Sequence, residues 1–109
     1  QKEEGGQILS SGNIRMDCQE MKVYKDDKEI LLSKRELQLL LYFLRNPKQI
    51  LSKEQILQQV WDVEGQFVDD NTVPVTIGRL KKKVSEGEEP EYIKNIRGMG
   101  YIWMMDVVF

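Results

Sequence analysis

The segment Asp69–Val84 reads DDNTVPVTIGRLKKKV, and its pattern is that of an amphipathic helix. Apolar residues recur at the spacing i, i+4, i+7 and i+11, which places them on one stripe of such a helix: these are Val73, Ile77, Leu80 and Val84. The flank beside that stripe carries polar side chains, with Val75 and Lys82 further round: these are Thr72, Thr76, Arg79 and Lys83. From Asn71 to Ser85 the chain has four cations and no acidic residue. We predict a helix that is anchored by one face and presents hydroxyl groups and positive charge on another.

Two interpretations of this helix are open from its own residues. Hydroxyl groups and cations beside an anchored face suit a helix that lies in a groove of DNA and contacts phosphates and base edges. Basic amphipathic helices are also common on protein surfaces, where their lysines are simply solvated. Pro74 requires the helix to begin near Asp70 or Asn71, because proline is tolerated in the first turn, where its missing N–H costs little.

The composition is that of one soluble globular domain. The chain has 109 residues, of which 40% are hydrophobic and 31% charged, enough for a modest core. Its apolar runs are too short for a membrane span, and no signal-peptide pattern opens it. The single cysteine, Cys18, has no partner within the chain, which favours a reducing compartment. We therefore expect a cytoplasmic domain with no membrane contact.

Charge and residue types bear on the class of function. A net charge of −2 and a pI of about 5.2 argue against a protein that coats nucleic acid indiscriminately, but not against one that gathers its cations on one face. Histidine, the commonest general base and a common metal ligand, is absent. No acidic pair, glycine-rich phosphate loop or nucleophile–base set stands out. We expect no enzymatic activity, no metal and no other cofactor.

Short apolar stretches separated by turn residues predict a sheet in the first third of the chain. Residues 1–6, QKEEGG, are polar and end in glycine, so we expect a flexible linker remnant followed by one domain over residues 7–109. The alternation that follows predicts four short antiparallel strands: Ile8–Leu9, Asn13–Asp17, Met21–Tyr24 and Glu29–Leu31.

Two capping boxes predict the starts of two more helices. Ser33–Glu36 has the S-x-x-E pattern and opens a leucine-rich helix that ends at Asn46–Pro47, because the residue before proline avoids helical geometry. Ser52–Gln55 is a second box, and the short helix after it carries Ile56, Leu57, Val60 and Trp61. Between them, Gln49–Leu51 has the pattern of a brief strand.

The last part of the chain predicts a hairpin. Tyr92–Arg97 and Tyr101–Met105 flank Gly98-Met99-Gly100, and glycine supplies the positive φ values that a tight turn needs. This interpretation places Arg97 at the tip.

The sequence resembles the OmpR/PhoB family of response-regulator effector domains. Val73–Lys83, VPVTIGRLKKK, followed by Ile96–Tyr101, IRGMGY, is similar to the family pattern T-V-x-V-x-I-x-x-L-R/K-x-K and its V/I-R-G-x-G-Y wing. Ser33–Leu41 looks like the family's first helix, and Leu51–Leu57 with Val60-Trp61 looks like its second. The resemblance covers nearly everything after Gly6, and the two motifs at this separation are highly specific.

This resemblance implies an α+β fold, a winged helix-turn-helix with an N-terminal four-stranded antiparallel sheet, a three-helix bundle and a C-terminal β-hairpin wing. It implies sequence-specific binding to double-stranded promoter DNA with direct repeats, and transcription regulation in a bacterial two-component regulatory system. Members normally carry a receiver domain, phosphorylated by a sensor histidine kinase. That receiver is absent here, so the chain looks like an isolated effector domain. We expect it to be a monomer when free and to pair on DNA, and RNA polymerase is a further implied partner.

Site residues carry over one by one from the family motifs. The third helix resembles the family's recognition helix, and the wing arginine enters the minor groove. The implied DNA-binding residues are Asn71, Thr72, Val75, Thr76, Arg79, Lys82, Lys83 and Arg97. The implied polymerase-contact loop consists of Asp62, Val63, Glu64, Gly65 and Gln66. Two positions depart from the family: Gly78 replaces a frequent cation, and Pro74 replaces a more ordinary helix residue.

Other interpretations are weaker but distinct. A winged helix used for protein–protein binding is favoured by the acidic pI and by Gly78. A hydrolase or transferase would need a catalytic set that the sequence does not show. A membrane-anchored relative with the same effector domain would need a spanning segment, and this chain shows none.

Overall fold

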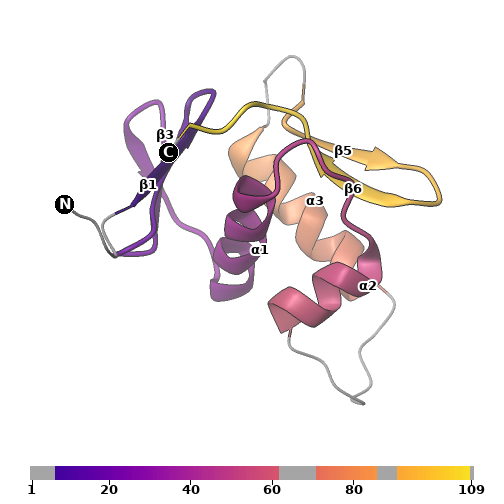
Figure 1. Ribbon diagram of the computed structural model, residues 1–109. Helices are drawn as coiled ribbons and strands as arrows, with labels where there is room; N and C mark the ends of the chain where they lie inside the picture. Colours follow the sequence, from indigo (N-terminus) through magenta and orange to yellow (C-terminus); the bar gives the residue numbers. More distant parts are fainter. Residues whose placement is uncertain (1–6, 62–70, 86–90, 109) are drawn as a thin grey trace.

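The computed structural model describes residues 7–61, 71–85 and 91–108. An antiparallel sheet with strand order β1-β2-β3-β4 forms its N-terminal part (Figure 1). The strands are β1 (Ile8–Ser11), β2 (Ile14–Asp17), β3 (Lys22–Lys25) and β4 (Lys28–Ile30). The four predicted strands are therefore confirmed, but three of their predicted end residues, Asn13, Met21 and Leu31, lie outside the observed strands. Met21 is not in a strand but in the turn before β3, with φ +55 and 36% exposure.

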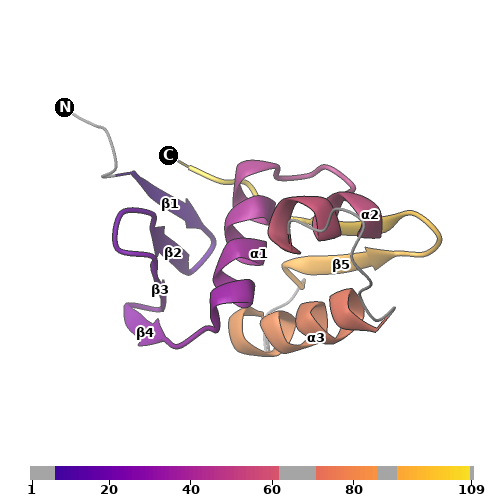
Figure 2. The same ribbon diagram turned by 90° about the horizontal axis from the view of Figure 1, so that it is seen from below.

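The helices follow the sheet, and α1 stands between the sheet and the rest of the molecule (Figure 2). They are α1 (Lys34–Arg45), α2 (Lys53–Ile56) with its π-helical continuation η1 (Leu57–Trp61), and α3 (Thr72–Val84). The change to π-helix at Leu57 was not predicted. Helix α3 begins after Asn71, which keeps Pro74 in the first turn as expected. Residues 1–6 and Asp69-Asp70 lie outside the described part of the chain.

Both predicted capping boxes are present. In the first, the Ser33 N–H donates to Glu36 Oε1 at 2.8 Å, and the Glu36 N–H donates to Ser33 Oγ at 3.2 Å. In the second, the corresponding distances between Ser52 and Gln55 are 2.8 and 3.1 Å. Each box satisfies two backbone N–H groups that a helix start leaves without an internal partner.

The C-terminal hairpin consists of β5 (Ile93–Ile96) and β6 (Gly100–Trp103). Of the predicted strand Gln49–Leu51, only Leu51 pairs with the hairpin, through two backbone hydrogen bonds to Tyr101 of 2.8 and 2.9 Å. Gly100 is required at this crossing, because its φ is +146 and a Cβ there would collide with the Leu51 carbonyl group. The hairpin is thereby held against the start of α2.

Trp103 lies at the centre of the core and connects the N-terminal sheet with the helical part of the domain. The side chain is fully buried, with the rings of Phe43 and Tyr92 at centroid distances of 6.4 and 5.4 Å. Its Nε1–H donates to Ser11 Oγ at 2.8 Å. Beyond Trp103 the chain returns to the sheet, where Val108 forms an antiparallel bridge with Ser10. Figure 1 shows this C-terminal segment ending beside β1.

Candidate nucleic-acid interface

The apolar stripe of α3 lies in the core, as its spacing predicted. Exposed fractions are 1% for Val73, 4% for Ile77 and 0% for both Leu80 and Val84. Because one residue turns a helix by about 100°, this burial also determines which residues face outward. The exposed residues of α3 include Val75, Gly78, Arg79 and Lys82, and Asn71 is exposed just before the helix.

The two threonines of α3 lie at its flank and are half-buried. Thr76 Oγ1 donates a hydrogen bond of 2.8 Å to the carbonyl oxygen of Thr72, one turn earlier. The Thr76 hydroxyl proton is therefore used within the helix, and its oxygen remains an acceptor for an outside donor.

The three consecutive lysines near the end of α3 differ in their partners. Lys83 Nζ lies 2.8 Å from Glu36 Oε1, and Lys81 Nζ lies 3.5 Å from Glu91 Oε1. Within the described residues, neither Lys82 nor Arg79 has a carboxylate partner. Phosphate neutralisation is thus open to Arg79 and Lys82, whereas Lys83 is already paired within the fold.

Glu36, the partner of Lys83, is a buried carboxylate whose side chain is only 4% exposed. Burial by itself raises its pKa. The hydrogen bonds from Lys83 and from the Ser33 N–H, with the charge of Lys83, outweigh burial and leave the pKa below its ordinary value. Glu36 therefore stays ionised at neutral pH and holds the Lys83 ammonium group. The sequence did not predict this contact.

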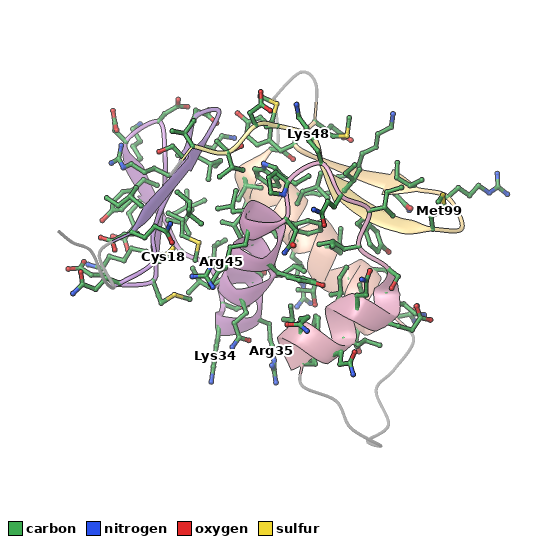
Figure 3. The ribbon with its side chains drawn as sticks, in the orientation of Figure 1. Cys18, Lys34, Arg35, Arg45, Lys48 and Met99 are labelled. Atoms are coloured by element: carbon green, nitrogen blue, oxygen red, sulfur yellow. The ribbon has the colours of Figure 1, made fainter. Side chains whose placement is uncertain are left out.

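The tip of the hairpin extends beyond the helices in both views (Figures 1 and 2). Gly98 has φ +76, and the Met99 N–H closes the turn on the Ile96 carbonyl oxygen at 2.9 Å. Arg97 is exposed at this tip, and Met99 is 59% exposed there (Figure 3). The expected position of Arg97 is confirmed, and its contact with DNA stays a prediction.

The residues where α2 meets the hairpin were not predicted from the sequence. A hollow of about 260 Å³ lies there, with Lys53 and Glu54 on one side and Asn95 among the residues of the hairpin on the other. The capping box and the wing motif predicted each element separately. Their proximity depends on the pairing of Leu51 with Tyr101, for which the sequence carries no local signal.

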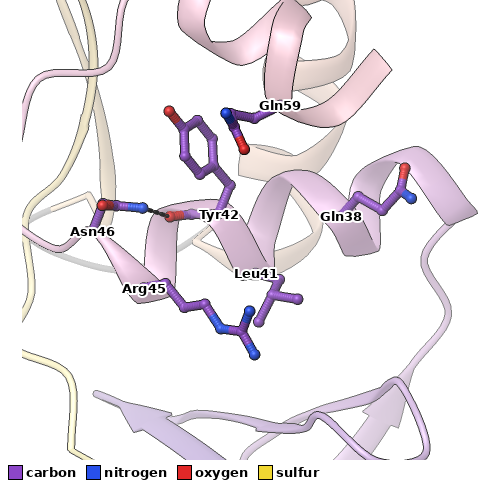
Figure 4. Close-up of a pocket in the computed structure, with 6 residues that line it drawn as sticks. All are labelled: Gln38, Leu41, Tyr42, Arg45, Asn46 and Gln59. Atoms are coloured by element: carbon purple, nitrogen blue, oxygen red, sulfur yellow. Dashed lines mark hydrogen bonds between the residues drawn. The ribbon is translucent and has the colours of Figure 1, made fainter. Parts of the chain in front are cut away.

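A larger hollow of about 560 Å³ lies over the C-terminal half of α1 (Figure 4). Its lining residues are Gln38, Leu41, Tyr42, Arg45, Asn46 and Gln59. Asn46 Nδ2 donates to the Tyr42 carbonyl oxygen at 2.9 Å, and burial raises the pKa of the Tyr42 hydroxyl. Among the described residues of this lining there is one guanidinium but no carboxylate, thiol or imidazole, and no nucleophile–base pair.

Cys18 directly follows β2 and lies near Arg45 of α1 (Figure 3). Burial raises the pKa of its thiol, and the nearby Arg45 acts in the opposite direction without cancelling this effect. The thiol is thus mostly protonated at neutral pH, which disfavours a nucleophilic role.

The proposed polymerase-contact residues, Asp62 to Gln66, lie outside the described part of the chain. None of the described helices combines the length and the apolar character needed to span a bilayer.

Known proteins with similar sequences identify the class of protein to which this arrangement belongs. Residues 27–103 match the family described as "Transcriptional regulatory protein, C terminal". The chain is 38% identical over 99 residues to the uncharacterized transcriptional regulatory protein YkoG of Bacillus subtilis (strain 168), covering 91% of this chain and 43% of that protein. It is 33% identical over 94 residues to the phosphate regulon transcriptional regulatory protein PhoB of Rhizobium meliloti (strain 1021), covering 86% and 41%. The chain therefore spans less than half the length of these relatives.

Solved structures agree with the sequence relatives. The RstA DNA-binding domain of Klebsiella pneumoniae, determined in complex with the RstA box, has a TM-score of 0.78 at 26% identity, covering 90% of this chain and 97% of that one. DrrB, an OmpR/PhoB homologue of Thermotoga maritima, has a TM-score of 0.78 at 28% identity, covering 89% and 44%. The DNA-binding domain of E. coli CadC has the same fold, with a TM-score of 0.81 at 22% identity and coverage of 94% and 95%.

A four-stranded sheet, three helices with a basic third member, and a C-terminal hairpin define a winged-helix domain. The predicted fold is therefore confirmed. This chain belongs to the OmpR/PhoB family of DNA-binding domains that regulate transcription, as the family match and the relatives show.

Proposed function

We propose that this chain recognises particular DNA sequences by placing α3 in the major groove and the β5–β6 hairpin in the adjacent minor groove. One observation carries this proposal. In a chain of net charge −2, the outward side of α3 presents Arg79 and Lys82 without a carboxylate partner in the described part of the fold. Exposed cations beside apolar and hydroxyl groups match the mixed chemistry of a DNA groove.

Each residue has a role that its chemistry supports. Arg79 makes a bidentate contact to guanine O6 and N7, and Lys82 neutralises a phosphate. Thr76 accepts a hydrogen bond from a base amine, because its own proton is used within the helix. Val75, which is 46% exposed, contacts a thymine methyl group. Asn71 and Thr72 contact base edges or phosphates at the start of α3.

The proposed roles of Arg97 and Lys83 differ from those of the other residues. Arg97 enters the minor groove, where a narrow A-tract raises the negative potential that attracts it. Lys83 contributes least to DNA binding, because its ammonium group is already paired with Glu36.

The whole protein is proposed to be a cytoplasmic two-component response regulator without enzymatic activity in this domain. The relatives YkoG and PhoB are transcriptional regulators more than twice as long as the matched segment, which leaves room for a receiver domain controlled by a sensor histidine kinase. The domain binds promoter direct repeats, as a monomer when free and as a pair on DNA, and acts on RNA polymerase through residues 62–66.

Selection of bound duplexes from a random DNA pool tests the proposal. Arg79→Ala is expected to weaken binding to the selected site by about 1–3 kcal/mol and to relax preference at one base pair. Lys82→Ala is the matched control and is expected to weaken binding on all sequences alike. Failure of the wild-type domain to enrich any sequence would refute specific recognition. Loss of base preference in Lys82→Ala but not in Arg79→Ala would refute the assigned roles.

The hairpin and the assembly state have separate tests. Arg97→Ala is expected to weaken binding most on duplexes that carry an A-tract beside the selected site. Sedimentation at micromolar concentration is expected to give a free monomer, and a stable free dimer would contradict the proposed pairing on DNA.

A further inference from the structure

Gly78 lies in the middle of α3, where glycine destabilises a helix relative to alanine. The fold itself gives no reason for this glycine. Its φ is not positive, and a Cβ built there would meet, beyond its chain neighbours and the backbone of its own helix, no atom of a described residue within 4 Å. At Gly100, by contrast, a Cβ would collide with the Leu51 carbonyl group. The described part of the fold does not explain this glycine, and the open surface beside it can be approached by a molecule outside the chain.

The position of Gly78 identifies that molecule as one that lies along α3. Val75, Gly78 and Lys82 are three and four residues apart, so they form a row on the side of the helix opposite Leu80. Val75 is 46% exposed, and Gly78 and Lys82 are also exposed. We call the uncovered backbone of Gly78 between these two side chains the notch. It lies on the side that the proposed function turns toward DNA.

We infer that the notch receives the 5-methyl group of a thymine, with the Val75 side chain packed against the same methyl. This inference rests on the proposed function and makes Gly78 a specificity-determining residue within it. The chemistry favours this group over other groove features. The thymine methyl is the only apolar group on a major-groove edge, and the notch offers it an apolar neighbour in Val75 and no side chain at position 78 itself.

Glycine matters here because of the room that a side chain would fill. An alanine Cβ at position 78 would point out from the helix into the space that the methyl group is proposed to occupy. The helix itself would gain, since alanine is the better helix former. Stability and recognition are thus expected to change in opposite directions, which separates this role from a structural one.

The test uses a duplex selected from a random pool by the wild-type domain. Each thymine is replaced in turn by deoxyuridine, which removes the 5-methyl group and keeps every hydrogen-bonding group of the base. The wild type is expected to lose about fourfold in affinity at one thymine, the effect of removing one buried carbon. The remaining replacements outside the notch are expected to have smaller effects.

Gly78→Ala is then compared with the wild type on the thymine and uracil duplexes. The variant is expected to raise Tm by about 4–8 °C, which shows that it folds. It is expected to bind the thymine duplex about fivefold or more weakly, because the methyl no longer fits, and to bind both duplexes alike. Lys82→Ala is the matched control from the same row. It is expected to weaken binding to both duplexes and to keep the fourfold preference for thymine.

Three outcomes would overturn the inference. The first is a wild type that discriminates against no single uracil. The second is a Gly78→Ala variant that keeps the thymine preference or binds as tightly as the wild type. In both cases the proposed function still stands, because the wild type selects DNA. If the wild type selects no duplex from the pool, the proposed function fails and the inference fails with it.

Discussion

The two capping boxes have nearly the same internal geometry but different surroundings. Ser33–Glu36 and Ser52–Gln55 each close a reciprocal pair of hydrogen bonds, with 2.8 Å from the serine N–H to the side-chain oxygen in both. The third helical residue is a buried glutamate in the first box and an exposed glutamine in the second. Glu36 accepts a further hydrogen bond from Lys83 of α3, whereas Gln55 serves only its own helix among the contacts seen.

The first box therefore caps α1 and also binds α3, whereas the second box only caps α2. Beside Glu36, Arg35 Nη1 donates to the Val60 carbonyl oxygen at 2.6 Å, and its guanidinium lies 5.6 Å from the centre of the Trp61 ring. The start of α1 thus contacts both η1 and α3. A local sequence motif can begin a helix and, with a charged residue at its last position, also fix a distant helix. The first box is the one that forms an ion pair with the proposed recognition helix.

The largest expected effect lies in the helix that the first box opens. Leu40 is fully buried in α1, and Leu57, just after the second box, is only half-buried. Leu40→Ala is expected to lower the free energy of unfolding by about 2–5 kcal/mol, because it removes buried methyl groups and leaves a cavity. Leu57→Ala should lose less than half as much. Urea denaturation measures both, and equal losses would remove the contrast between the two helices.

The next effect tests the ion pair that distinguishes the boxes. Lys83→Met leaves the Glu36 carboxylate buried without its cation and is expected to cost about 1–3 kcal/mol of stability. Glu36→Gln converts the first box to the type of the second and keeps the capping bonds. In a double-mutant cycle, the two changes together should cost less than the sum of the single changes. Additive losses would mean that the pair contributes nothing to stability.

The same pair predicts a dependence on pH. The pKa of Glu36 in the folded chain is below its ordinary value of 4.5, so its stabilisation is complete above that value. It is lost as the pH falls through the lower pKa of the folded state. The stability difference between wild type and Glu36→Gln should therefore be constant near neutral pH and shrink below about pH 4.5. A difference that changes between pH 6 and 8 would contradict this assignment.

The smallest effect compares the neighbouring lysines on DNA. Lys82→Ala should reduce the slope of log affinity against log salt by about 0.9, because one phosphate contact is lost. Lys83→Met should change the slope by less than half of that. Glu36→Gln should steepen the slope, since it releases the Lys83 ammonium group. An equal reduction for both lysines would mean that Lys83 leaves Glu36 when DNA binds.

Features that depend on neighbouring residues were predictable from the sequence. Spacings between residues close together in sequence predicted the strands and both capping boxes. They also predicted the end of α1 at Asn46 and the buried stripe of α3. The same holds for the hairpin, whose turn needs glycine at position 98.

Features that depend on how elements pack against each other were not predictable. A helical wheel places Lys83 beside Thr76 and Arg79, but it does not tell which flank faces α1. Only the packing of α3 on α1 brings Lys83 to Glu36, across 47 residues of sequence. For the same reason the hollow beside Lys53 was missed, because it arises from the pairing of Leu51 with Tyr101.

The pairing of Ser10 with Val108 has a consequence for the engineering of this domain. Two backbone hydrogen bonds of 2.9 and 2.7 Å hold residues near the two ends of the described chain side by side. A short glycine-serine linker could therefore join them, and the chain could be opened at the exposed turn Asp26-Asp27 between β3 and β4. Such a circular permutant would keep every contact of α3 and the hairpin, while β1 to β3 would follow β6 in the new order. The fold depends on which elements meet, and their order along the chain is open to change.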